Sequence, residues 1–210
     1  HLLFGAISAP LWLLVLVFLF LFRDPARKVP AVPLGIVSPG DGKIVAVEIV
    51  HDTYLDRQAL DVSIKMGFTS VYSAHSPMEG KVLQQWLGSS KKTASEVLND
   101  NVEVTSDAVD EKSISYAQWI QSDEKDDVVL IIETSRRSSR PKCYVQSGER
   151  IGQGQRCGFI RFGSQVDVLV PVSSRVSVSV GDDVLAGSDI IATLVHAKVV
   201  TPKPAQMPSA

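Results

Sequence analysis

A chain of 210 residues is long enough for one domain of ordinary size with an appendage. Its formal net charge of −2 argues against a nucleic-acid-binding protein, because such a protein needs a broad basic face. The two cysteines, Cys143 and Cys157, lack metal-ligand spacing such as Cys-x-x-Cys, so we expect reduced thiols and no metal site.

Residues 1–22 are predicted to be a membrane anchor. They contain no Asp, Glu, Lys or Arg, and residues 11–22 form an unbroken apolar run. A helix of about 20 apolar residues crosses a hydrocarbon core of about 30 Å. A cleavable signal peptide is the alternative, but the run ends in bulky residues without an Ala-x-Ala site. Arg23, Arg27 and Lys28 follow, which predicts a cell-membrane protein whose main part lies on the cytoplasmic side.

The rest of the chain is predicted to be a linker, a β domain and a tail. Residues 23–33 form the linker, since three prolines favour extended backbone. Residues 34–200 carry strand and turn signals throughout, and 127–133 contains a continuous apolar run typical of a strand buried on both faces. Residues 201–210 contain prolines and are expected to be disordered.

Two segments share the pattern Ser-Pro-x-x-Gly-Lys followed by Ile or Val. They cover residues 38–44 and 76–82, and the repeat predicts a pseudo-symmetric pair of turns. Asp41 lies in the first segment and His75 directly precedes the second. Out of context, a turn carboxylate most often caps its own loop and a histidine most often lies on the surface.

The dipeptide Gly163-Ser164 lies between a glycine-rich segment and a run of alternating valines. The glycine-rich segment covers residues 148–160, and the valines are at 166, 168 and 170. On its own, such a pair indicates only a tight backbone or a turn.

Taken in order, these blocks resemble the phosphatidylserine decarboxylases in their short, membrane-anchored form. The blocks are Phe22-Arg23-Asp24-Pro25, Ser38-Pro39-Gly40-Asp41-Gly42, residues 75–82, Arg136-Arg137 through Cys143, and residues 154–164. Each block alone is weak, whereas the ordered set extends over most of the chain and is specific. The resemblance implies a mainly β, barrel-sandwich-like domain behind an N-terminal transmembrane helix.

The resemblance implies a proenzyme that cuts itself between Gly163 and Ser164. In this chemistry the Ser164 hydroxyl attacks the Gly163 carbonyl and converts the amide into an ester. Elimination then releases residues 1–163, and hydrolysis leaves a pyruvoyl group at the start of residues 164–210. A glycine before the serine suits the attack, because glycine tolerates strained backbone. The two products are expected to stay together as a heterodimer, and a higher oligomer is compatible with the sequence.

The family activates its serine with a histidine that an aspartate holds, and the matching residues here are His75 and Asp41. One position departs from the family pattern. Members usually carry a histidine five residues before the proline of the second turn, and this chain has Tyr72 there. Tyr72 is therefore a candidate for positioning the substrate carboxylate by a hydrogen bond. Gln165 replaces the more frequent Thr or Arg after the serine, which bears on specificity.

The activity implied by the resemblance is that of a carboxy-lyase of phospholipid biosynthesis, which decarboxylates phosphatidylserine to phosphatidylethanolamine. A pyruvoyl carbonyl condenses with the substrate amine and withdraws the electrons left when CO₂ departs, so neither pyridoxal phosphate nor a metal is expected. His75 is then placed to protonate the carbanion. A membrane anchor suits this substrate, because a phospholipid headgroup stays at the membrane surface.

Three alternatives remain open on the sequence. A non-catalytic carrier of the lipoyl or biotinyl type is suggested by residues 181–190, which resemble a turn of such domains, and faintly by Lys65 in Ile64-Lys65-Met66. A membrane-anchored export adaptor shares the sheet style and the N-terminal helix, but usually carries a coiled-coil hairpin, and no heptad pattern occurs here. The third is a family member that does not process itself or that acts on another amino lipid.

Overall fold

The computed structural model describes residues 10–17, 19, 27–67, 70–90, 113–134, 141–160 and 164–196. Within these ranges, regular structure consists of one helical segment, at 10–17 and 19, and fourteen strands. The strands are β1 (Gly35–Val37), β2 (Gly42–Asp52), β3 (Arg57–Lys65), β4 (Ser73–His75), β5 (Gly80–Ser90), β6 (Ser113–Gln121), β7 (Asp127–Thr134), β8 (Lys142–Cys143), β9 (Arg150–Ile151), β10 (Arg156–Phe159), β11 (Gln165–Pro171), β12 (Arg175–Val176), β13 (Asp183–Val184) and β14 (Ile190–Thr193). The prediction of a mainly β protein is confirmed.

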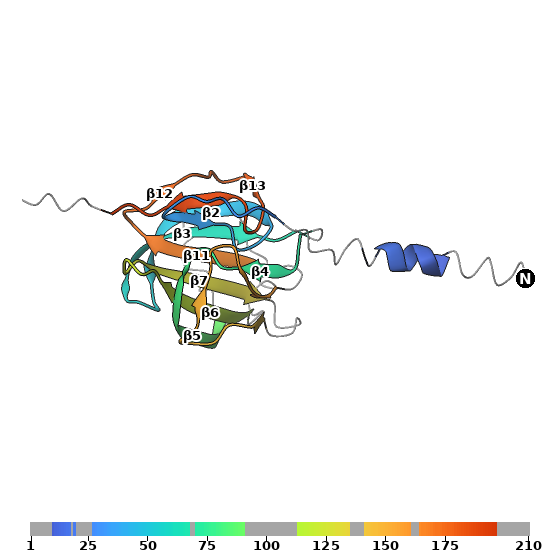
Figure 1. The fold of residues 1–210 in the computed structure, drawn as a ribbon, viewed down its shortest axis with the longest axis horizontal. Coiled ribbons are helices and arrows are strands. Elements are labelled where there is room, and N and C mark those ends of the chain that lie inside the picture. The colour runs from blue at the N-terminus through green and yellow to red at the C-terminus, as the bar shows by residue number, and fades with distance from the viewer. Residues whose placement is uncertain are drawn as a thin grey trace, which may run out of the picture.

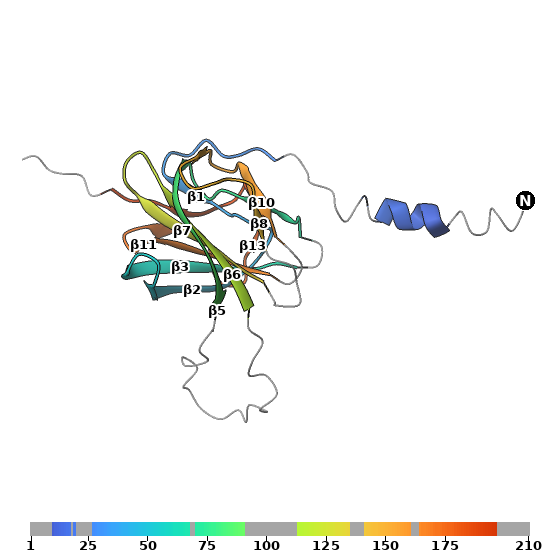
Figure 2. The same ribbon diagram turned by 90° about the horizontal axis from the view of Figure 1, so that it is seen from below.

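Eight strands form one antiparallel sheet in the order β13-β2-β3-β11-β7-β6-β5-β9. The strand direction changes across the sheet, so that it curls into a half-barrel (Figures 1 and 2). The order is symmetric about the β11–β7 pair, with three strands in matching positions on each side. The predicted strand at 127–133 is β7, and Val128, Val129 and Leu130 are fully buried, which confirms that both of its faces are covered.

Each face of this sheet buries its own apolar cluster. The inner face carries the larger one, to which β3, β7 and β11 contribute alternate residues such as Val168. On the outer face, the small cluster around Val129 and Leu169 is covered by Tyr54 and Trp86, whose ring centroids lie 5.0 Å apart. Burial on both faces makes these central strands a firm base for residues at their ends.

Two three-stranded sheets close the inner face, in the orders β1-β14-β12 and β4-β10-β8. Their apolar residues, including Ile36, Ala74 and Ile191, belong to the same inner cluster. Cys143 of β8 and Cys157 of β10 are both free thiols, as the sequence predicts. The β1 and β4 strands lead into the two turns with the shared Ser-Pro pattern.

These two turns have the same internal hydrogen bond, which confirms the predicted pair. The Ser38 hydroxyl donates to the Gly40 carbonyl at 2.7 Å, and the Ser76 hydroxyl donates to the Met78 carbonyl at 2.7 Å. A serine hydroxyl that bonds the backbone two residues on stabilises a tight turn. Each turn then opens into a long strand, β2 or β5, at its glycine.

The two turns also bond each other in a reciprocal way. The Val37 N–H donates to the Pro77 carbonyl at 2.8 Å, and the His75 N–H donates to the Pro39 carbonyl at 2.9 Å. Both donors occupy the same place, directly before the serine of their own turn. Segments separated by nearly forty positions in the chain are thus joined at the centre of the domain.

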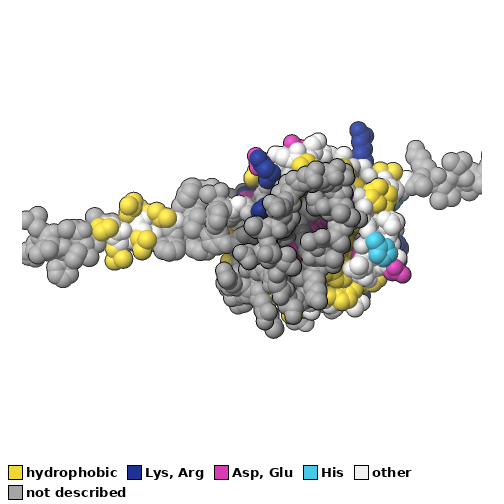
Figure 3. Space-filling model, turned by 180° about the vertical axis from the view of Figure 1, so that it is seen from behind, with side chains coloured by type: hydrophobic (Ala, Val, Ile, Leu, Met, Phe, Trp, Pro, Cys, Tyr) yellow, Lys and Arg dark blue, Asp and Glu magenta, His cyan; other side chains and the backbone are white. Residues whose placement is uncertain are grey.

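The described residues of the N-terminal segment do not support the predicted transmembrane helix. No helix in the described part of the chain is long and apolar enough to cross a membrane. A transmembrane helix over residues 1–22 is therefore not supported: the helix is described at 10–17 and 19 alone, and the rest of that segment lies outside the described residues. The apolar side chains of this helix are exposed and appear in yellow in Figure 3. The predicted tail at 201–210 also lies outside the described residues.

The glycines at the start of β2 and β5 leave room for a carbonyl oxygen of a neighbouring strand, so we expect a larger residue at either position to destabilise the protein. A Cβ at Gly80 would lie 2.4 Å from the Gln121 carbonyl oxygen, and one at Gly42 would lie 2.4 Å from the Lys65 carbonyl oxygen. We expect Gly80→Ala to lower the melting temperature by roughly 2–12 °C, because overpacking costs about 1–3 kcal/mol. Gly88→Ala is the matched control in β5, since its Cβ would lie 3.7 Å from the Ser115 hydroxyl. Equal melting temperatures for the two variants in a thermal melt would contradict this.

Candidate active site

Ser164 lies directly before β11 and is fully buried. Its carbonyl accepts a hydrogen bond from the Met66 N–H at 3.2 Å, on the β3 side. On the β7 side, its hydroxyl oxygen lies 3.0 Å from the hydroxyl oxygen of Thr134, which is only 1% exposed. Contacts with both neighbouring strands therefore hold Ser164 at the end of the sheet. Gly163, the other half of the predicted cleavage bond, lies outside the described residues.

Asp41 is the most strongly bonded carboxylate of the site. The Arg27 guanidinium donates to both carboxylate oxygens, with Nη2 2.7 Å from Oδ2. Backbone N–H groups add two more bonds, from Ala186 at 2.7 Å and from Val71 at 3.4 Å. Burial alone would raise the pKa of Asp41, but these hydrogen bonds and the Arg27 charge outweigh it and lower the pKa. The carboxylate is therefore ionised at neutral pH.

His75 ends β4 and is positioned by the two turns. It pairs with Arg156 of β10, and its N–H donates to the carbonyl of Pro39 in the turn that carries Asp41. Its ring lies against the β13–β14 connection, where a Cβ at Gly187 would be 3.5 Å from Cδ2. The neighbouring Ala186 bonds Asp41, so one short segment contacts both predicted residues.

Tyr72 is buried near this end of the inner face. Its carbonyl accepts a hydrogen bond from the Ile160 N–H at 2.7 Å, and its ring centroid lies 6.0 Å from that of Phe159. Burial raises the pKa of Tyr72, so the phenol stays neutral and keeps its hydroxyl hydrogen at neutral pH. Tyr72 therefore offers a hydrogen bond where the family histidine would also offer a charge.

The predicted residues gather at one end of the inner face. A Cβ at Gly40 would lie 3.8 Å from a methyl group of Val166 and 3.9 Å from the Ile160 side chain, so the turn of Asp41 packs against the start of β11. Ser164 is the residue just before that start. The structure thus brings Asp41, His75 and Ser164 into one region.

A cavity of about 560 Å³ opens beside Asp41 and Met66, whose N–H bonds Ser164. Lys43 and Lys65 stand opposite each other on β2 and β3 at this cavity, and Asp183 stands opposite Lys43 on β13. Two partly exposed apolar side chains, Val45 and Leu185, lie at the same cavity. The lining residues are Asp41, Gly42, Lys43, Val45, Lys65, Met66, Gly67, Ser70, Asp183, Val184 and Leu185.

Two residues of this region were not predicted from the sequence. Arg27 was interpreted as a basic flank of the membrane segment, whereas its guanidinium binds Asp41. Thr134 follows the predicted strand at 127–133, and a polar residue at the end of a buried strand was the available signal. The identity of its partner depends on the pairing of β7 with β11, which local sequence does not reveal.

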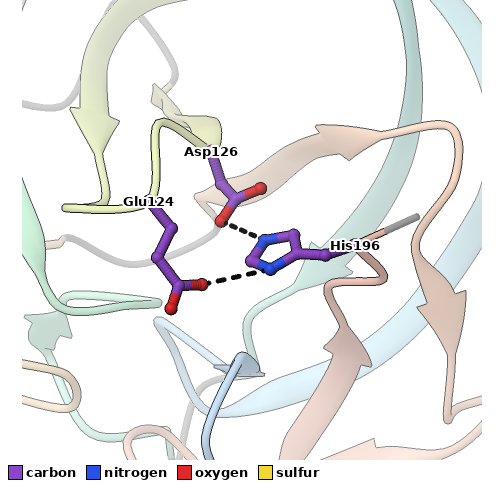
Figure 4. Close-up of side chains that lie close together, drawn as sticks. All are labelled: Glu124, Asp126 and His196. Carbon is purple, nitrogen blue, oxygen red and sulfur yellow. Dashed lines mark hydrogen bonds and ion pairs between the residues drawn. The ribbon is translucent and has the colours of Figure 1, made fainter. Parts of the chain in front are cut away.

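A second polar cluster lies away from this site and joins Glu124, Asp126 and His196 (Figure 4). The Nδ1 atom of His196 is 3.1 Å from the Glu124 carboxylate, and Nε2 is 2.7 Å from that of Asp126. A metal ion binds one ring nitrogen of a histidine, whereas here both face carboxylates, which suits a protonated ring. The hydrogen bond to Asp126 is the main cause that raises the pKa of His196.

The comparisons with known proteins agree with one another. Residues 14–192 match a family model described as phosphatidylserine decarboxylase. A relative from Nitrosomonas europaea is 38% identical over 185 residues, which cover 88% of this chain and 82% of the relative. Relatives from Aromatoleum aromaticum, at 37% over 187 residues (89% and 83%), and Burkholderia multivorans, at 38% over 187 residues (88% and 82%), are also similar. All three are named phosphatidylserine decarboxylase proenzyme, and no solved structure matches the chain.

The His196 cluster predicts a pH-dependent contribution to stability. Because its pKa is raised in the folded protein, the contribution is present below the ordinary histidine pKa of about 6.5 and is lost as pH rises through the raised value. We expect His196→Gln to lower the melting temperature at pH 6 by about 1–3 °C and to have no effect at pH 9. His51→Gln, in the β2–β3 hairpin, controls for loss of an exposed histidine. A decrease of the same size at both pH values would count against the charged contact.

Proposed function

Because the chain belongs to the phosphatidylserine decarboxylase family, we propose that it cuts itself at Gly163-Ser164 and then decarboxylates phosphatidylserine to phosphatidylethanolamine with a pyruvoyl group made from Ser164. The observation that carries this proposal is the burial and fixation of Ser164 at the end of β11. Ser164 is held at both its carbonyl and its hydroxyl inside the core, which fixes the nucleophile at the end of the sheet.

Self-cleavage begins with the hydroxyl of Ser164, which attacks the Gly163 carbonyl. A serine needs a base at neutral pH, and His75 takes the proton in this proposal. Two contacts of His75 support this role. Its backbone N–H donates to the turn that carries Asp41, and its ring contacts Gly187. Asp41 stays ionised and holds the same connection through Ala186, so it keeps the surroundings of His75 in place.

The pyruvoyl group, once present, supplies an electron-withdrawing carbonyl for decarboxylation, and position 164 fits it. That position is buried, lies beside a cavity and is bonded through its own carbonyl to Met66. Tyr72 donates a hydrogen bond toward the substrate carboxylate, and its neutral phenol suits this role at neutral pH. His75 delivers the proton that replaces CO₂.

The cavity suits a phospholipid headgroup. Lys43 and Lys65 are directly opposed on neighbouring strands, and like charges in this arrangement repel each other. Asp183 stands opposite Lys43 on β13 and offsets part of this repulsion, and the phosphodiester of a headgroup supplies a further anion for the two lysines. Val45 and Leu185 give the glycerol and acyl carbons an apolar rim. Gln165 follows Ser164, and its Nε2 donates to the Asp167 carboxylate at 2.7 Å. This contact lies on the face of the sheet opposite to the Ser164 side chain.

The two products are proposed to remain a heterodimer. Three of the four strands after position 164 pair with a strand from before it: β11 with β3 and β7, β13 with β2, and β14 with β1. The fourth, β12, pairs with β14. Cutting one peptide bond leaves these ladders intact. The ion pairs of His196 with Glu124 and Asp126 add a contact between the same two products.

We propose that the enzyme works at the cytoplasmic side of the cell membrane, with residues 1–22 as the anchor. The support is the apolar composition of that segment and the exposure of Leu11, Trp12 and Leu13, which are 61–68% exposed. The carrier alternative is disfavoured by Lys65, which ends a strand within the large sheet, whereas a carrier lysine needs a hairpin tip.

Intact-mass analysis tests the proposed processing. We expect the purified protein to contain two chains, residues 1–163 and 164–210, of which the smaller lacks a free N-terminal amine. Ser164→Ala should remain a single chain and show no decarboxylation, because it has neither the nucleophile nor the precursor of the pyruvoyl group. A single full-length chain in an active wild-type preparation would refute the pyruvoyl mechanism.

Steady-state kinetics on phosphatidylserine in mixed micelles test the cavity. The double variant Lys43→Gln and Lys65→Gln should raise KM about tenfold or more and leave kcat nearly unchanged, because two charge-assisted contacts to the phosphodiester are lost. Lys81→Gln, on β5 outside the cavity, is the control. An unchanged KM for the double variant would show that the headgroup binds elsewhere.

A further inference from the structure

We propose that Thr134 is a catalytic residue of the self-cleavage, which donates its hydroxyl hydrogen to the Ser164 oxygen while that oxygen becomes the leaving group. This inference rests on the proposed cut at Gly163-Ser164. It concerns a residue outside the Ser164, His75 and Asp41 set, and it assigns that residue to one step of the reaction.

The geometry places the two hydroxyl groups in direct contact inside the protein. Their oxygens are 3.0 Å apart, within normal hydrogen-bond distance, and the two residues are 0% and 1% exposed. The contact follows from strand register. Gln165 pairs with Glu133, so the preceding Ser164 and the following Thr134 come next to each other on the inner face.

The direction of this hydrogen bond follows from the chemistry of the serine. Each hydroxyl has one hydrogen to donate and can accept from a second donor. If Ser164 donated to Thr134, its hydrogen would point away from the base that must remove it. In the productive arrangement, Thr134 donates to the Ser164 oxygen, and the serine hydrogen is left for His75.

The same oxygen changes its role during the reaction. In the first step it bonds to the Gly163 carbonyl carbon, the carbon–nitrogen bond breaks, and the Ser164 nitrogen gains a proton, which gives an ester. In the second step a base removes the Cα hydrogen, and the bond between Cβ and this oxygen breaks. The electron pair of that bond goes to the oxygen, which leaves as part of the Gly163 carboxylate.

Negative charge therefore develops on the one atom that Thr134 contacts. A donor that already points at such an atom in a buried site stabilises the transition state without reorganisation. Loss of one donor of this kind typically slows a reaction by about 10²–10³-fold. The branched side chain of threonine also restricts its rotamers, which keeps the hydroxyl group directed at Ser164. Thr134 thus acts mainly in the elimination step.

The test compares Thr134→Val, which keeps the shape and removes the hydroxyl, with Thr134→Ser, which keeps the hydroxyl. Self-cleavage of the freshly made full-length chain is followed by denaturing electrophoresis, with and without hydroxylamine, which cuts esters. We expect Thr134→Val to be cleaved about 100-fold more slowly and to accumulate full-length chain that hydroxylamine cuts at position 163. Thr134→Ser should process within a few-fold of the wild type. Thermal melts check that each variant is folded.

Each other outcome has a definite meaning. Wild-type cleavage in Thr134→Val would overturn the inference, and so would slow cleavage without a hydroxylamine-sensitive chain, since the attack step alone would then be affected. An equal defect in Thr134→Ser would make packing the cause and also overturn it. If Thr134→Val does not fold, Thr134→Ala must accumulate the same ester. A wild-type chain that never cleaves would instead refute the proposed function, which distinguishes the two failures.

Discussion

The insertion of β11 between β3 and β7 is the constraint on which the rest of the site depends. All seven residues of Gln165–Pro171 pair with β3, and the first five pair with β7. The inward-facing valines of the strand are fully buried, and a slip of one residue would turn all of them to the opposite face. The pairing of β11 therefore fixes the position of the residue directly before the strand. Ser164 occupies that place, between the Met66 N–H and the Thr134 hydroxyl.

Polar groups buried in a β core need hydrogen-bond or ion-pair partners, because burial without a partner destabilises the folded protein. Leaving one partner of a buried ion pair alone costs about 3–5 kcal/mol, which is a large part of the stability of a domain. Asp41 is compensated by Arg27 and by two backbone N–H groups, and Ser164 by Thr134. Arg27 belongs to the segment predicted as a linker, so formation of the site depends on residues that precede the β domain. The contact between Arg27 and Asp41 thus links the burial of the carboxylate to the position of that segment.

The sequence was sufficient for the features that depend on local pattern. The buried strand at 127–133 followed from its apolar run, the paired turns from their repeated residues, and the family from the order of its blocks. The contacts between distant segments were not predictable. Periodicity tells which face of a strand is buried, but it does not tell which strand lies beside it, and so it could not match Thr134 with Ser164 or Arg27 with Asp41. Apolar composition also predicted a transmembrane span at residues 1–22, and the described residues do not support one.

The symmetry of the large sheet gives the position of Ser164 a counterpart on the other side. Ser164 precedes β11 and accepts a bond from the Met66 N–H at 3.2 Å; Asp126 precedes β7 and accepts one from the Ser122 N–H at 2.9 Å. One of these equivalent places holds the bond that is proposed to break, and the other holds the carboxylate that binds His196. The proposed cut thus interrupts the chain at one of these places, and at the other the ion pairs of His196 join the same two pieces.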